Sequence, residues 1–168
     1  MTGRFDYDNE LVLTNRTRQG SPGIDLLTPV RIAGSDTAVI VDRGWVYAPD
    51  GSTVDRGRWR EGDSARGTGY VELYTPDNGE TILAKDPRIV RHASRREITA
   101  RLPYPVAPYL VVLVGDTSTA GHPARRELPV LDDGPHRSYA VQWFCFAAIA
   151  LGGAVAVIRR ERVGPAGV

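Results

Sequence analysis

The feature that most constrains this chain is an uninterrupted apolar stretch near its C-terminus. Residues 138–158 include no formally charged side chain. At about 1.5 Å of rise per residue, a helix over this stretch is roughly 31 Å long, close to the roughly 30 Å of a bilayer's hydrocarbon core. Tyr139 and Trp143 stand at one end and arginines, starting at Arg159, at the other, as expected at two membrane interfaces. The stretch therefore predicts a membrane-spanning helix.

The predicted helix begins close to Pro135. Gly134 suits the N-cap, and proline suits the first helical position, where its missing N–H leaves no hydrogen bond unmade. His136 is then the second helical residue and lies near the headgroup boundary. The alternative is a helix buried in a soluble core, but too little chain follows the arginines to wrap the helix on all sides.

Composition predicts that the remaining chain of about 135 residues is one domain. Its 18 glycines and 12 prolines favour many turns and short strands. The 21 basic and 20 acidic residues nearly cancel, so no global field recruits nucleic acid. The single cysteine, Cys145, lies in the apolar stretch, which excludes a cysteine-based zinc or redox site. We expect three parts: a β-rich extramembrane domain over 1–133, a transmembrane helix over 134–160 and a short tail over 161–168.

The domain is predicted to be mainly β and β-barrel-like, with one short helix. The segments predicted to be extended are 3–18, 24–32, 37–47 and 109–115. The last two are rich in β-branched residues, so we expect them to pair in the core. Pro29 lacks an N–H and favours an edge strand or a bulge. The short helix is predicted over 89–102, where apolar residues recur four apart.

Arg43, Gly44 and Trp45 form a motif within the strand predicted over 37–47. A glycine in mid-strand predicts a bulge or a close backbone approach. Arg43 beside Trp45 predicts a cation–aromatic contact that supports the scaffold. A ligand site at these residues is the alternative.

No group of residues indicates catalysis, so we expect no enzyme. The histidines His92, His122 and His136 lack the paired spacing of a metal site, and no serine occupies a nucleophile elbow. His136 differs because it would lie at the headgroup boundary, on one helix face with Ala140 and Trp143. An imidazole there can coordinate a haem iron beside a flat apolar surface. The alternative, which position alone favours, is a capping or interfacial histidine that only prefers the headgroup region.

Small residues recur along the predicted membrane helix. Ala148, Gly152 and Ala156 are four residues apart. This spacing lets a second helix approach closely. A loosely packed span is the alternative interpretation.

Several landmarks occur in the order found in the Surfeit locus protein 1 family. The most specific are Asp-Arg-Gly-Trp-Val at 42–46 and Gly-Pro-His-Arg-Ser-Tyr-Ala-Val-Gln-Trp-Phe at 134–144. The chain resembles this family over nearly its whole length. The resemblance implies a non-enzymatic, membrane-bound assembly factor for haem–copper cytochrome c oxidase that helps to place haem a in the catalytic subunit.

The resemblance also implies a site and an orientation. His136 matches the family's proposed haem-iron ligand, and Tyr139, Trp143 and Phe144 match its aromatic companions. The β-rich domain would lie on the outer, periplasmic or extracytoplasmic, side of the cell membrane, with the C-terminus in the cytoplasm. Implied partners are the oxidase catalytic subunit, the haem a synthesis machinery and the lipid bilayer, without nucleic acid.

Because polar residues follow Met1 directly, we expect no counterpart of the family's first membrane helix in the given residues. On its own residues the chain is therefore expected to be tail-anchored. The alternative function is a tail-anchored interaction domain that binds another membrane protein without haem.

Overall fold

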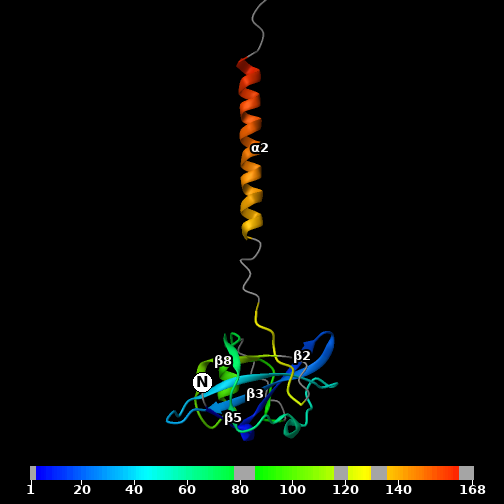
Figure 1. The fold of residues 1–168 in the computed structure, drawn as a ribbon, viewed down its shortest axis with the longest axis vertical. Helices are drawn as coiled ribbons and strands as arrows, with labels where there is room; N and C mark the ends of the chain where they lie inside the picture. Colours follow the sequence, from blue (N-terminus) through cyan, green and yellow to red (C-terminus); the bar gives the residue numbers. More distant parts are fainter. Residues whose placement is uncertain (1–2, 78–85, 116–120, 130–135, 163–168) are drawn as a thin grey trace, which may run out of the picture. The chain divides into compact units, whose positions relative to one another are not determined.

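A computed structural model describes residues 3–77, 86–115, 121–129 and 136–162. The chain divides into two compact units, 1–128 and 129–168. The first unit contains an eight-stranded sheet, and the second contains one long helix (Figure 1). The predicted fold class, a mainly β domain plus one C-terminal apolar helix, is confirmed.

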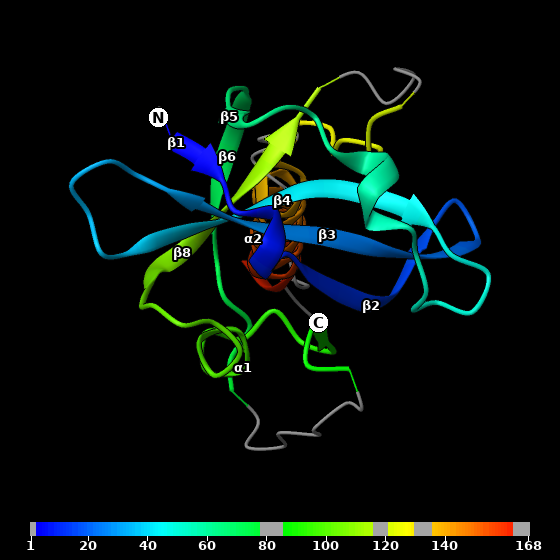
Figure 2. The same ribbon diagram turned by 90° about the horizontal axis from the view of Figure 1, so that it is seen from below.

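The sheet of the first unit follows the order β5-β1-β3-β4-β8-β6, and β2 pairs with both β3 and β7. Its pairs are antiparallel except β4 with β8 and β2 with β7. The sheet forms a half-barrel, seen from below in Figure 2. Its elements are β1 (Gly3–Phe5), η1 (Tyr7–Asn9), β2 (Leu11–Arg18), β3 (Ser21–Arg31), β4 (Ala38–Tyr47), η2 (Arg56–Trp59), β5 (Ser64–Ala65), β6 (Thr68–Leu73), β7 (Ile89–Val90), α1 (Arg95–Thr99) and β8 (Val106–Val114).

The centre of the sheet is formed by β3, β4 and β8. The parallel pairing of β4 with β8 confirms the pairing expected for 37–47 and 109–115. Ile40 of β4 and Leu110 of β8 are direct partners, and both are buried in the main apolar cluster together with Leu27 of β3. Burial of each such side chain stabilises the fold by roughly 1.5–3 kcal/mol. Charged residues in the same strands lose their hydration when they are buried, so they need partners.

Pro29 does not mark an edge strand or a bulge, so that prediction is wrong. It lies in β3, which pairs with β4 on one side and with β1 and β2 on the other. The carbonyl of Pro29 accepts the N–H of Asp6 at 2.8 Å. Since N–H and C=O of one residue point the same way in an antiparallel strand, the missing N–H faces the gap between β1 and β2. No ladder hydrogen bond is lost there.

The helix predicted over 89–102 is shorter than expected. Its first residues form β7, which pairs with β2, and only α1 is helical. Ser94 caps α1 by accepting the N–H of Glu97 at 3.2 Å. The Glu97 carboxylate in turn accepts the N–H groups of Arg91 and His92. These bonds hold the preceding residues outside the helix, and β-branched Ile and Val favour the strand.

Candidate functional site

The helix α2 (His136–Arg162) begins at the histidine that the sequence singles out. Its segment Ser138–Arg160 is long and apolar enough to cross a membrane, judged by length and composition. This agrees with the predicted span. The predicted cap and first helical residue, Gly134 and Pro135, lie outside the described residues.

Exposed aromatic side chains lie near the start of α2: Tyr139, Trp143, Phe144 and Phe146. Helical spacing puts position 136 on the same side of α2 as Ala140 and Trp143. The Trp143 side chain is 70% exposed, and its ring meets that of Phe146 edge-on, with centroids 6.1 Å apart. The sequence argument did not include Phe146. The first turns of α2 therefore offer an exposed aromatic surface to a partner or ligand.

The small residues of α2 leave its middle open. A Cβ built on Gly152 would meet no atom within 4 Å, and the same holds for Gly153. Ala148 and Ala156 lie one turn before and one turn after Gly152 and are also exposed. The role of these residues in helix packing stays a prediction.

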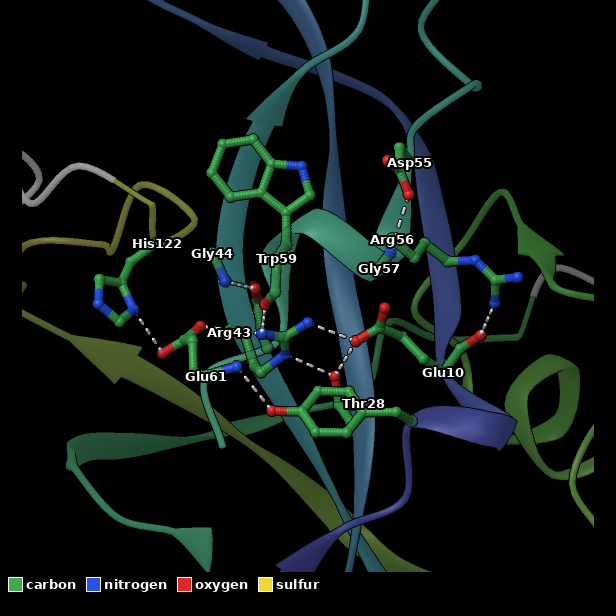
Figure 3. A network of polar contacts seen from close by, with 12 residues as sticks. Glu10, Thr28, Arg43, Gly44, Asp55, Arg56, Gly57, Trp59, Glu61 and His122 are labelled. Carbon is green, nitrogen blue, oxygen red and sulfur yellow. Dashed lines mark hydrogen bonds and ion pairs between the residues drawn. The ribbon is translucent and has the colours of Figure 1, made fainter. Parts of the chain in front are cut away.

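The domain contains a buried ion cluster centred on Arg43, whose side chain is 0% exposed (Figure 3). Its Nη2 donates to Glu10 Oε2 at 2.5 Å, and its Nη1 donates to Glu61 Oε1 at 2.9 Å. Its Nε donates to the Thr28 hydroxyl at 2.7 Å, and this hydroxyl donates to Glu10. Nη1 also donates to the Trp59 carbonyl. Each guanidinium nitrogen therefore has an acceptor, as a buried cation requires.

The aromatic neighbours of Arg43 are Phe5 and Tyr7. The guanidinium carbon lies 5.8 Å from the Phe5 ring centroid and 5.1 Å from that of Tyr7. Trp45 instead meets Tyr47, with centroids 6.4 Å apart. The predicted contact between Arg43 and Trp45 is therefore wrong.

Gly44 explains this difference. The register of β3 and β4 shifts at this point, so β4 carries one extra residue. Gly44 has a φ of +119°, and a Cβ there would lie 2.5 Å from the Ala124 carbonyl oxygen. The predicted bulge and close approach are both present. Because a bulge breaks the two-residue alternation, Arg43 and Trp45 do not share a face.

Residues 121–128 are tied to the ion cluster through Glu61. Arg125 donates to the Glu61 carboxylate and to the Arg43 carbonyl. His122 Nδ1 lies 3.2 Å from Glu61 Oε2. Burial lowers the pKa of Arg125, an effect that the Glu61 charge opposes. The last segment of the first unit is thus fixed to the centre of the sheet.

Asp25 and Asp42 form a second buried charged group. Asp25 Oδ2 accepts from Arg16 Nε at 2.8 Å and from Arg126 Nη2 at 3.1 Å. Arg126 Nη2 also lies 3.3 Å from Asp42 Oδ2, while Asp42 Oδ1 accepts the N–H of Gly44. Burial, and next the neighbouring Asp25 charge, raises the pKa of Asp42 to about 7. Asp42 therefore exchanges its proton near neutral pH.

Both charged groups fit a structural role. Within the part of the chain that the structure describes, no three His, Cys, Asp or Glu side chains are placed to hold a metal ion. Arg43 was predicted to have a structural role, whereas the buried charges of Glu10, Glu61, Asp25 and Asp42 were not predicted. One signal was available, because Asp42 and Arg43 interrupt an apolar strand and buried charges need partners. Those partners are distant in sequence and were not accessible to pattern reasoning.

Comparison with known proteins identifies the family. No curated protein and no solved structure matches the chain. The model of the SURF1 family matches residues 1–148, which include the whole first unit and the start of α2 with His136 and Trp143. The resemblance seen in the sequence is thereby confirmed. The chain belongs to the SURF1 family, and this membership implies a role in the assembly of cytochrome c oxidase.

Proposed function

We propose that this chain assists the insertion or stabilisation of haem a in the catalytic subunit of cytochrome c oxidase, without being an enzyme. Family membership supports the assembly role. The observation that carries the haem step is the start of α2, where a histidine opens an apolar helix whose next two turns expose aromatic rings. Haem a is the proposed cofactor, held directly or only during transfer.

The residues at the start of α2 fit a haem. A histidine imidazole is a common axial ligand, so His136 would hold the iron. Tyr139, Ala140 and Trp143 would cover one face of the macrocycle. Phe146 meets the Trp143 ring edge-on and extends this aromatic surface. When bound, haem a supplies the redox-active iron that the oxidase needs.

We propose that the outer face of the cell membrane carries the β-rich domain. In this arrangement residues 1–133 lie outside, 134–160 cross the bilayer, and 161–168 lie in the cytoplasm. The candidate span Ser138–Arg160 supports membrane anchoring. The proposed orientation is the one that the family resemblance implies. An interfacial His136 would then meet haem at the outer boundary of the bilayer.

The proposed partners are the oxidase catalytic subunit and the haem a synthesis machinery. The open small-residue surface of Ala148, Gly152 and Ala156 is where a partner helix could approach closely. Van der Waals contact over such a surface drives helix association in lipid, where the hydrophobic effect between helices is absent.

Haem content tests the proposal. The full chain is co-expressed with haem a synthesis enzymes, purified in detergent, and its haem is measured per polypeptide. We expect haem in the wild type and clearly lower occupancy in His136→Ala. His92→Ala, which changes a histidine of the β-rich domain, is the matched control and should keep wild-type occupancy. Equal haem content in wild type and His136→Ala would reject the ligand role and favour the haem-free interaction domain.

A further inference from the structure

A cavity of about 390 Å³ lies at the end of the β2–β3 hairpin, within the first unit. Its wall includes Trp45 and the four arginines Arg16, Arg18, Arg125 and Arg126. The volume lies within the range of roughly 300–1,000 Å³ typical of ligand sites. None of these residues belongs to the proposed haem site in α2.

Two of the arginines keep unused donors. Arg18 Nη1 donates to the carbonyls of Ala124 and Arg125, and no carboxylate in the described residues pairs with Arg18. Arg16 donates through Nε to Asp25, and its side chain is 40% exposed. Because a guanidinium carries five N–H groups in a fixed fork, both side chains have N–H groups left for a ligand. The backbone contacts of Arg18 also hold its charge in place.

Of the two acidic residues in the wall, Asp25 already has arginine partners. Asp25 accepts from both Arg16 and Arg126, and Arg126 also lies close to Asp42. The raised pKa of Asp42 further reduces the negative charge near neutral pH. Glu127 is exposed and makes no ion pair within the described residues. The wall therefore combines four arginines with two carboxylates, while outside the wall Glu61 pairs with Arg125 and Glu72 Oε2 lies 4.0 Å from Arg126 Nη1. Arg18 is the wall arginine that has no carboxylate partner among the described residues.

Trp45 supplies an apolar wall. Gly23 makes room for its indole, since a Cβ on Gly23 would lie 2.4 Å from the indole Nε1. That Nε1 is buried and has no acceptor within the described residues.

We propose that this cavity binds carboxylate side chains of an acidic segment of a partner protein. Planar guanidinium groups match carboxylates through paired hydrogen bonds, and Trp45 can cover the apolar stems of Asp or Glu side chains. This inference rests on the assembly role, which requires the chain to contact proteins.

The test is calorimetric titration of the full chain in detergent with a capped hexaglutamate peptide, and separately with inorganic phosphate. We expect the peptide to bind with an affinity that falls as salt rises. Arg18→Ala should weaken binding roughly tenfold, the effect of losing charge-assisted hydrogen bonds. Arg16→Ala should act in the same direction. Arg60→Ala, at a site that is 57% exposed and outside the cavity, is the matched control and should bind like the wild type.

Equal peptide affinity in Arg18→Ala and Arg60→Ala would overturn the inference. Binding of phosphate without binding of peptide would overturn it too. Arg18 has no carboxylate partner among the described residues, so its variant stays informative even if Arg16→Ala fails to fold. The haem content of Arg18→Ala separates this inference from the proposed function. Weak peptide binding by Arg18→Ala with normal haem content supports the cavity site. If the wild-type chain binds the peptide but takes up no haem, the cavity site stands and only haem binding is rejected.

Discussion

Replacing Arg43 with methionine tests the buried ion cluster. The side chain stays long and unbranched but loses its charge, while Glu10 at 1% and Glu61 at 10% side-chain exposure remain in place. Removing one partner of a buried ion pair costs roughly 3–5 kcal/mol, because the other charge is left without compensation. For a domain of this size, the midpoint of thermal unfolding should fall by roughly 10–20 °C.

The assay is thermal unfolding of the full chain in detergent, followed by the circular dichroism of the β-rich domain. A double variant with Arg43→Met and Glu10→Met should be more stable than Arg43→Met alone, since Glu61 keeps Arg125 and His122 as partners. The control Arg4→Met removes an ion pair that is 75% exposed on both sides and should change little. The reasoning fails if Arg43→Met unfolds within a few degrees of wild type, or if the double variant is the less stable of the two.

Three further predictions concern protonation, backbone and membrane. The pKa of Asp42 in the folded state, about 7, lies above its unfolded value of 3.8. The protonated carboxyl therefore stabilises the fold by up to about 4 kcal/mol. This contribution is complete below about pH 4 and is lost as pH rises through 7. Urea unfolding at several pH values should show this loss in wild type and not in Asp42→Asn; parallel profiles would contradict the assignment. Gly44→Ala should lower the urea midpoint much more than Gly34→Ala does. Both glycines have positive φ, but of the two only Gly44 faces a carbonyl oxygen, that of Ala124. Equal midpoints would count against the close approach. Leu151→Arg places a charge inside the candidate span, which makes membrane insertion less favourable by roughly 2.5–3.5 kcal/mol. A smaller fraction of the protein should then stay in the membranes after alkaline extraction. Unchanged retention would argue against a span.

The sequence predicted those parts of the fold that depend on local patterns. The apolar stretch of α2 predicted a helix, and the β-branched runs of β4 and β8 predicted strands. Segments that are buried on both faces or lie in lipid are apolar without interruption, so they can be recognised in the sequence. The bulge at Gly44 was also predictable, since glycine in mid-strand has few other uses.

Features set by distant partners were not predictable. Pro29 fits a central strand only because β1 and β2 leave a gap beside it. Residues 89–102 lose most of their helical pattern because β2 pairs with β7 and Ser94 caps a shorter helix. The ion cluster joins Glu10, Arg43 and Arg125 from three separate segments, and spacing along the chain carries no information about such contacts.

The prediction of the candidate site rests more on resemblance than on residue chemistry. His136 alone is also consistent with an interfacial histidine, and only its place in the family landmark singles it out. The aromatic surface around Trp143 followed from helical spacing, whereas its contact with Phe146 needed the structure.

The most direct test of the central claim is the haem a absorption of membranes from cells that lack this gene. The account predicts a reduced haem a signal, restored by the wild-type chain and restored less by His136→Ala at equal protein level. An undiminished haem a signal in membranes without the gene would contradict it.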